Sequence, residues 1–75
     1  MKNIETLIDD GGSISVGALA PIGCVAAASD GSNCLAMLVR RDGETLLELM
    51  ARFDEAIGLA WSDSLFTDEV NNRDR

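Results

Sequence analysis

The sequence predicts a small α+β fold in which an antiparallel β-hairpin, preceded by a further strand, packs on one C-terminal amphipathic helix. Three observations favour this ββ(β)α unit: an alternating segment at 13–20, two uncharged segments around a polar turn at 30–33, and apolar residues at helical spacing from 46 to 61. We expect residues 1–64 to form one compact domain with a short N-terminal lead-in, and residues 65–75 to form an acidic, partly disordered tail.

Length and composition favour an assembly. The chain has 75 residues, of which 47% are apolar and 25% charged, and its formal net charge is −7. It is too hydrophobic for a disordered acidic chain, and too short and interrupted for a membrane span. A chain of this size buries only about 60% of the surface that its unfolded form exposes, so its core is marginal without a partner.

Charge is distributed unevenly along the chain. Residues 1–41 include four acidic and three basic residues, whereas residues 42–75 include nine acidic and three basic ones. Because phosphate backbones are bound chiefly by lysine and arginine, this charge disfavours direct binding to nucleic acid. The acidic half either keeps a small protein soluble or recognises a basic partner.

The uncharged stretch 14–28 does not have the features of an export signal. Such a signal needs positive residues before its apolar region, whereas Lys2 is outweighed by three nearby acidic residues and Pro21 interrupts the stretch. We therefore expect a cytoplasmic protein that does not associate with membranes.

The first segments predict a helical lead-in and one strand. Ile4, Leu7 and Ile8 have helical spacing, and Gly11-Gly12 ends this segment. The next apolar residues alternate with serine and glycine, a period of two that suits a strand with one buried face: Ile14, Val16, Ala18 and Ala20. Because Pro21 follows and cannot donate to a ladder, this segment is either an edge strand or an irregular arm.

The clearest motif is a β-hairpin formed by residues 22–29 and 34–41 around Asp30-Gly31-Ser32-Asn33. With a four-residue loop, one face carries the bulkier residues Ile22, Cys24, Ala26, Ala28, Leu35, Met37 and Val39. The other face carries Gly23, Val25, Ala27, Ser29, Cys34, Ala36 and Leu38. Asp30 is the only charged residue between Ser13 and Val39, so both faces need a cover.

The hairpin also separates the two cysteines. A four-residue loop places Cys24 opposite Val39, and a two-residue loop places it opposite Met37. Because Cys34 is not its partner in either register, we expect two reduced thiols that pack as small hydrophobic residues.

The helix that follows has a strong start signal. Asp42-Gly43 makes a turn, and Thr45 with Glu48 fits a capping box. Glu48 and Arg52 are spaced for an ion pair on the charged side. The opposite arc is expected to pack on the bulkier hairpin face and consists of Leu46, Leu49, Met50, Phe53, Ala56, Ile57, Ala60 and Trp61.

The remaining apolar residues predict a contact between subunits. The helix flank contributes Leu47, Ala51, Gly58 and Leu59, and the second hairpin face contributes Val25, Ala27, Ala36 and Leu38. We interpret these eight residues as the interface of a homodimer. A tight monomer and an obligate complex with a different protein are the alternatives.

Four further residues are candidates for binding another partner. Glu48 and Glu55 lie on the acidic side of the helix and suit a basic protein. Leu65 and Phe66 either fold back under the helix end near Trp61 or form a short docking motif. We expect residues 72–75 to be disordered.

Catalytic chemistry finds little support. The chain has no histidine, its two cysteines lack metal-ligand spacing, and no glycine-rich segment forms a phosphate-binding motif. We therefore expect no catalytic, metal-binding or cofactor-binding residues, and a small accessory protein of bacterial type that acts through protein contacts. Two rivals are an inhibitor that neutralises a basic partner and a small-molecule binder with a pocket between helix and sheet.

One resemblance supports the inhibitor. A hairpin followed by Asp42-Gly43-Glu44-Thr45-Leu46-Leu47-Glu48, with a helix ending Asp54-Glu55-Ala56-Ile57, resembles the small acidic antitoxins of the HicB type. The resemblance covers about a third of the chain. This chain departs from the family pattern because it has neither an aromatic first strand nor an attached DNA-binding segment. The resemblance implies a partner toxin that is neutralised by burial of its site.

Overall fold

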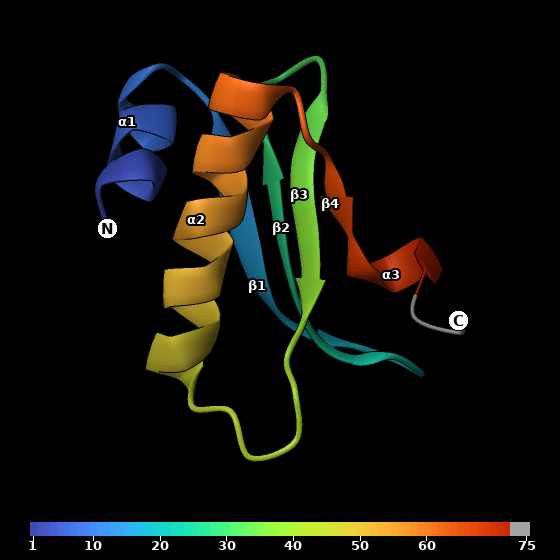
Figure 1. Cartoon of the computed structure of the whole chain (residues 1–75). Helices are drawn as coiled ribbons and strands as arrows, with labels where there is room; N and C mark the ends of the chain where they lie inside the picture. Colours follow the sequence, from blue (N-terminus) through green and yellow to red (C-terminus); the bar gives the residue numbers. More distant parts are fainter. Residues whose placement is uncertain (73–75) are drawn as a thin grey trace.

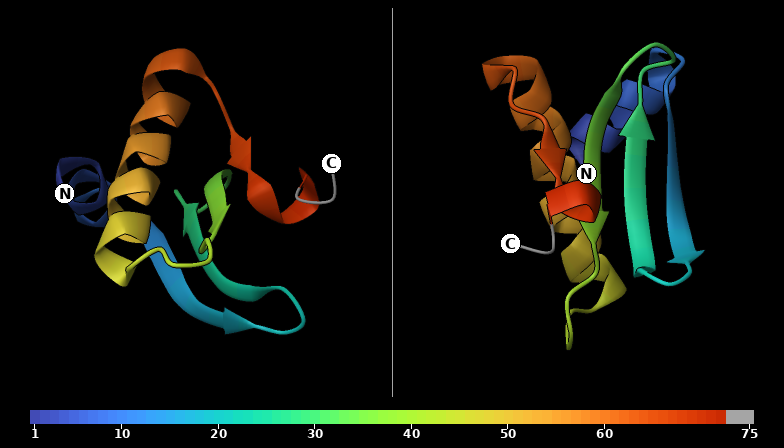
Figure 2. Two further views of the ribbon diagram at one scale, coloured as in Figure 1. Left: turned by 60° about the horizontal axis from the view of Figure 1, so that its bottom comes forward. Right: turned by 90° about the vertical axis from the view of Figure 1, so that its right-hand side faces the viewer.

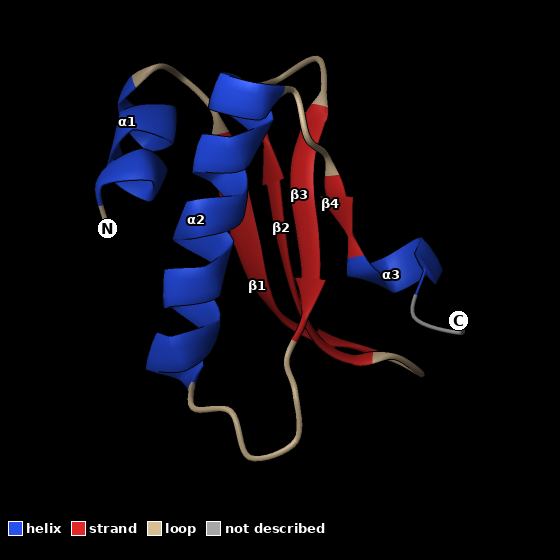
Figure 3. Cartoon of the chain, in the orientation of Figure 1, coloured by secondary structure: helices blue, strands red, loops and turns tan. Residues whose placement is uncertain are grey.

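The computed structural model describes residues 1–72 and confirms a small, compact α+β fold (Figure 1). The elements are α1 (Lys2–Asp9), β1 (Ser13–Leu19), β2 (Gly23–Ser29), β3 (Cys34–Val39), α2 (Leu46–Asp63), β4 (Thr67–Asp68) and α3 (Glu69–Asn72). The predicted order up to α2 is confirmed, and β4 and α3 are additions within the predicted tail (Figure 3). Residues 73–75, which we expected to be disordered, lie outside the described residues, and Asn72 ends α3.

Within residues 1–72 the strands form one four-stranded sheet in the order β1-β2-β3-β4. The first three strands are antiparallel neighbours, whereas β4 runs parallel to β3, so the sheet is mixed. The prediction that the segment before Pro21 is an edge strand is confirmed. Helix α2 crosses one face of the sheet, and α1 packs against α2 on the side of β1 (Figures 1 and 2).

Helix α2 begins and is buried as its sequence predicts, except at its ends. Thr45 Oγ1 accepts from the Glu48 backbone NH at 3.1 Å, and Glu48 Oε1 accepts from the Thr45 NH at 2.8 Å, which confirms the capping box. The centre of the apolar arc is fully buried and comprises Leu49, Phe53, Ala56 and Ile57. Leu46 and Trp61, which lie in the first and last turns of the helix, stay 49% and 42% exposed.

The hairpin turn forms where it was predicted. Asp30 Oδ1 accepts from the backbone NH of Asn33 at 2.8 Å and from that of Ser32 at 3.0 Å, and these bonds lower the pKa of Asp30. Ser29 lies opposite Cys34, as a four-residue loop requires. The side chain of Asp30 thus supplies the acceptors that a tight turn needs.

Beyond the turn, both predicted registers are wrong. The pairing passes from Ser29–Cys34 to Ala28–Ala36, so a β-bulge at Leu35 shifts every later pair by one residue. Since side chains alternate along a strand, this shift exchanges the two faces of β3. The face under α2 therefore carries Ala26, Ala28, Ala36 and Leu38, and the second face carries Val25, Ala27, Met37 and Val39.

The expectation that the cysteines do not meet holds despite the register error. Cys34 lies opposite Ser29 on β3, whereas Cys24 lies opposite Ala18 on the other side of β2. Both residues are free thiols, Cys24 half-buried and Cys34 exposed.

The N-terminal lead-in is part of the core. Leu7 of α1 is 1% exposed and packs with the buried residues of α2 and the sheet. Gly12 makes this packing possible, because a Cβ atom there would collide with the Leu7 side chain and lie 2.8 Å from the Ser29 carbonyl oxygen. Glycine, which has no Cβ atom, is therefore needed at this close approach of α1 and β2.

The tail follows β3 and does not fold under α2. Leu65 and Phe66 are 51% and 47% exposed, so the expectation that they pack beneath the helix end is wrong. Ser64 ends α2 in the left-handed conformation (φ 54°), and Thr67 then pairs with Ala36 of β3. In residues 1–72, the helices are all too short or too polar to cross a membrane.

Candidate interaction surfaces

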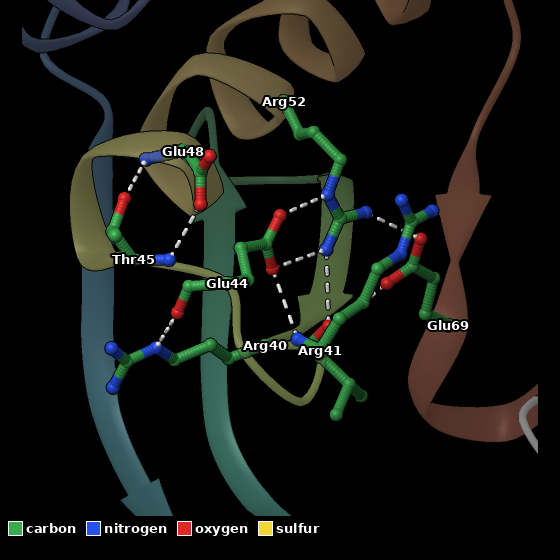
Figure 4. Close-up of polar contacts among 8 residues, drawn as sticks. Arg40, Arg41, Glu44, Thr45, Glu48, Arg52 and Glu69 are labelled. Carbon is green, nitrogen blue, oxygen red and sulfur yellow. Dashed lines mark hydrogen bonds and ion pairs between the residues drawn. The ribbon is translucent and has the colours of Figure 1, made fainter.

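The edge of β3 beyond β4 is closed by two side chains (Figure 4). Glu69 Oε1 accepts from the Val39 backbone NH at 2.9 Å, and Arg52 Nη2 donates to the Val39 carbonyl oxygen at 3.1 Å. Arg52 Nη1 also lies 2.9 Å from Glu69 Oε2. These groups satisfy the backbone of Val39 as a neighbouring strand would, so the short strand β4 is extended by an ion pair.

Arg52 also fixes the loop that enters α2. Its Nε and Nη2 donate to the two carboxylate oxygens of Glu44 at 2.7 and 3.0 Å, a bidentate arrangement. The Arg52 contact, aided by the Arg41 backbone NH, lowers the pKa of Glu44 from 4.5 to about 2. The same contact raises the pKa of Arg52, so both groups stay charged at neutral pH. The network is structural, since its donors and acceptors bond one another.

The Arg52 network was not predicted. The sequence pointed to a pair between Glu48 and Arg52, but Glu48 bonds the Thr45 backbone and Arg52 bonds Glu44 and Glu69. Glu44 and Glu69 are 8 and 17 residues from Arg52, so no helical spacing connects them. Of the two partners of Arg52, only Glu44 has a position that the sequence could have suggested, because it precedes the capping residue Thr45 at the start of the helix.

The opposite edge of the sheet is β1, and it has a different character. Its sequence, Ser-Ile-Ser-Val-Gly-Ala-Leu, has no charge, and Ile14 is its only half-buried residue while the other six are exposed. Natural edge strands are usually protected by charges, proline or a bulge. Strand β1 has none of these devices between Ser13 and Leu19.

The second face of the sheet carries a shallow apolar depression of about 290 Å³. Gly17 and Leu19 of β1, Val25 and Ala27 of β2, Met37 of β3 and Val70 of α3 contribute to its lining. The face is apolar as predicted, but it is already partly covered in the single chain, because Val25 is 7% exposed and Ala27 and Met37 are half-buried. Only two of the predicted interface residues, Val25 and Ala27, lie on it.

The eight predicted interface residues do not form one surface. Ala36 and Leu38 are 0% and 1% exposed in the core under α2, because the bulge moves them to that face. Gly58 is covered by α1: a Cβ atom there would lie 2.6 Å from Asn3 Nδ2. On the helix flank, Leu47 is 72% exposed, Leu59 is 37% exposed and Ala51 is exposed.

The four residues predicted to bind another partner also have different surroundings. The Glu48 side chain is engaged in the capping box, whereas Glu55 is exposed on the outer face of α2. Leu65 and Phe66 lie between α2 and β4, at the end of the helix that carries Trp61. This end exposes two of the three aromatic side chains of the protein, a composition common at protein contacts.

The described residues contain neither a cluster of metal ligands nor an open space between α2 and the sheet. In residues 1–72 no group of three His, Cys, Asp or Glu side chains is placed to hold a metal ion. The space between α2 and the sheet is filled by Leu49, Phe53 and Ile57, each 0% exposed. Two open depressions of about 590 and 510 Å³ flank residues 40–42, outside the helix–sheet interior.

Comparison with known proteins gives no relative from which a role could be transferred. No protein-family model, no curated protein and no solved structure matches this chain.

Proposed function

We propose that the protein is a small non-catalytic interaction module that works as a homodimer in the cytoplasm. One observation carries this proposal: a chain with a net charge of −7 has an entirely uncharged stretch from Ser13 to Ser29, and one strand of it lies exposed at the sheet edge. Uncharged surface of this extent on an acidic protein is typical of a contact with another protein. The free thiols of Cys24 and Cys34 suit a reducing compartment.

Size supports the same conclusion. The core contains few large side chains, and its fully buried members include Leu7, Leu38, Leu49, Phe53 and Ile57. Several others remain exposed in the single chain, including Leu19 at 50% and Leu47 at 72%. A second subunit would remove part of this surface from water and add stability that a domain of 75 residues otherwise lacks.

Light scattering coupled to size-exclusion chromatography over a dilution series tests the proposal. We expect twice the mass of 8.0 kDa at high concentration and a shift towards 8.0 kDa on dilution. Thermal unfolding should occur at higher temperature as the concentration rises, because association stabilises only the folded state. A mass of 8.0 kDa at every concentration would contradict the proposal.

The acidic helix supports an inhibitor of a basic protein as the second candidate. Glu55 is exposed, and residues 42–75 include nine acidic residues, so electrostatic attraction to a basic surface is available. Charge reversal at Glu55 should abolish salt-sensitive capture of such a partner. Glu48 is unsuitable for this test because its replacement also removes the helix cap.

A further inference from the structure

We propose that two copies join through β1, which pairs antiparallel with its own symmetry mate around Val16 to make one continuous eight-stranded sheet from two four-stranded ones. The inference rests on the proposed homodimer and names its surface. The first reason is that only one of the two sheet edges is protected. One edge is closed by Arg52 and Glu69 on the backbone of Val39, whereas β1 offers an unprotected edge.

The second reason is charge. Two copies carry −7 each, so most contacts between them bring carboxylates together. The helix flank around Leu47 lies next to Glu48 and in the half of the chain with nine acidic residues. Residues 13–29 carry no charge, so the paired β1 strands themselves bring no carboxylates together. A basic protein would instead be drawn to the acidic helix, which makes a second copy the better occupant of the β1 edge.

The third reason is symmetry. Two identical strands paired antiparallel form a two-fold contact in which each residue pair occurs twice. With Val16 on the axis, Ile14 pairs with Ala18 of the other copy on the face that α2 covers, and Ser15 pairs with Gly17 on the second face. At the strand ends Leu19 pairs with Ser13, so no two bulky side chains stand opposite one another, and such pairs suit a sheet.

Helix α1 provides a cover for the added strand. It lies on the β1 side of the molecule, beside α2 (Figure 2), and exposes 46% of Ile8 after its buried face has packed on the core. A strand added next to β1 extends the sheet towards this helix. Burial of this helix surface by the added strand would remove apolar area from water.

Val16→Lys and Leu47→Lys are a matched pair of variants for testing the contact. Both replace an exposed apolar residue by lysine and change the net charge from −7 to −6, so general repulsion falls equally in both. In the proposed dimer the two introduced lysines of Val16→Lys stand opposite one another, and like charges in that position are unfavourable. We expect its dimer dissociation constant to rise about tenfold or more, whereas Leu47→Lys should dimerise as the wild type does. Circular dichroism checks that both variants fold.

Hydrogen exchange of the unmodified protein tests the same contact without a substitution. Alternate amides of β1 point away from β2 and exchange quickly in a single chain, so we expect their protection to increase with protein concentration. A wild-type dimer that survives Val16→Lys, or in which β1 amides exchange independently of concentration, overturns this inference and leaves the homodimer standing. Loss of the dimer in Leu47→Lys alone would move the interface to the helix. A monomeric wild type overturns the homodimer and the β1 pairing together.

Discussion

Arg52 and Glu69 form an ion pair, 2.9 Å between Nη1 and Oε2, that takes the place of a neighbouring strand along the last residue of β3. The pair joins three parts of the chain: α2, the edge of the sheet and the C-terminal tail. Glu69 lies 17 residues after Arg52, so the contact depends on the fold being formed. It explains how a strand of two residues, β4, stays on the sheet.

Replacing Arg52 with alanine should release the tail. The change removes the partner of Glu69 and Glu44 and leaves the Val39 carbonyl oxygen without its donor. We expect the free energy of unfolding to fall by roughly 1 kcal/mol, measured by urea denaturation, because the network is only partly buried. In the variant, amides of residues 67–70 should exchange faster than in the wild type, and this increase should be larger than any increase for amides of β2. Arg40→Ala removes a single exposed bond to the Glu44 carbonyl oxygen and should change stability by no more than about 0.5 kcal/mol.

Arg52→Lys distinguishes the loss of charge from the loss of geometry. Lysine keeps the positive charge but cannot make the bidentate contact with Glu44 while also reaching Glu69. We therefore expect Arg52→Lys to behave like Arg52→Ala in hydrogen exchange. Wild-type protection in the lysine variant would show that charge alone holds the tail.

The Glu44–Arg52 contact predicts a loss of stability in acid. The pKa of Glu44 is about 2 in the folded protein and 4.5 ordinarily, so the unfolded chain binds the proton first as pH falls. The contact thus stabilises the fold fully above pH 4.5, and this contribution is lost between pH 4.5 and about 2. Glu44→Gln should lower stability at neutral pH and show a flatter decline across that interval. Urea midpoints at a series of pH values provide the measurement.

A control for the acid experiment is Glu55→Gln. It removes the same formal charge from an exposed carboxylate for which the structure shows no hydrogen bond within residues 1–72. Its stability should follow the wild-type pH profile. If the two variants showed the same profile, general charge and not the Arg52 contact would explain the acid sensitivity.

Local signals in the sequence predicted local structure correctly. The capping box of Thr45, the turn at Asp30 and the edge position of the strand before Pro21 each depend on a few neighbouring residues, and each is confirmed. The register of the hairpin was wrong because the bulge at Leu35 depends on packing: it buries Leu35, 8% exposed, in the core together with Ala36. The residues of the turn alone do not determine that packing, so they could not reveal the bulge.

The interface residues show the same limit. Gly58 was predicted to lie at a contact between subunits, and it does lie at a close contact, but the approaching group is Asn3 of the same chain. Asn3 Nδ2 donates to the Asp54 carbonyl oxygen at 3.1 Å, and the two residues are 51 positions apart. Small residues on a helix therefore indicated a contact correctly and could not identify the partner.

Replacing Leu38 and Met37 separately tests the register. The bulge places Leu38 in the core at 1% exposure and Met37 at the depression on the second face. Leu38→Ala should cost about 3 kcal/mol through loss of buried volume, and Met37→Ala about 1 kcal/mol. The regular four-residue-loop register, which places Met37 under α2, predicts instead that Met37→Ala costs more stability than Leu38→Ala. Chemical denaturation at one protein concentration decides between them.

The contact between Gly58 and Asn3 predicts that Gly58→Ala changes stability differently in the presence and in the absence of the Asn3 side chain. In the wild type, Gly58→Ala adds a better helix former to α2 but places a Cβ atom 2.6 Å from Asn3 Nδ2, so the side chain must move and its bond to Asp54 is lost. We expect these effects to nearly cancel in the free energy of unfolding, while amides of α1 exchange faster.

In an Asn3→Ala background the obstacle is gone, and the same Gly58→Ala substitution should stabilise the protein by about 0.5–1 kcal/mol. The four proteins make a double-mutant cycle in which the coupling energy reports the Asn3–Gly58 contact. Equal effects of Gly58→Ala in both backgrounds would mean that α1 does not press on α2 at this point. Since Leu7 is anchored independently in the core, α1 should stay helical in all four proteins, and circular dichroism checks this.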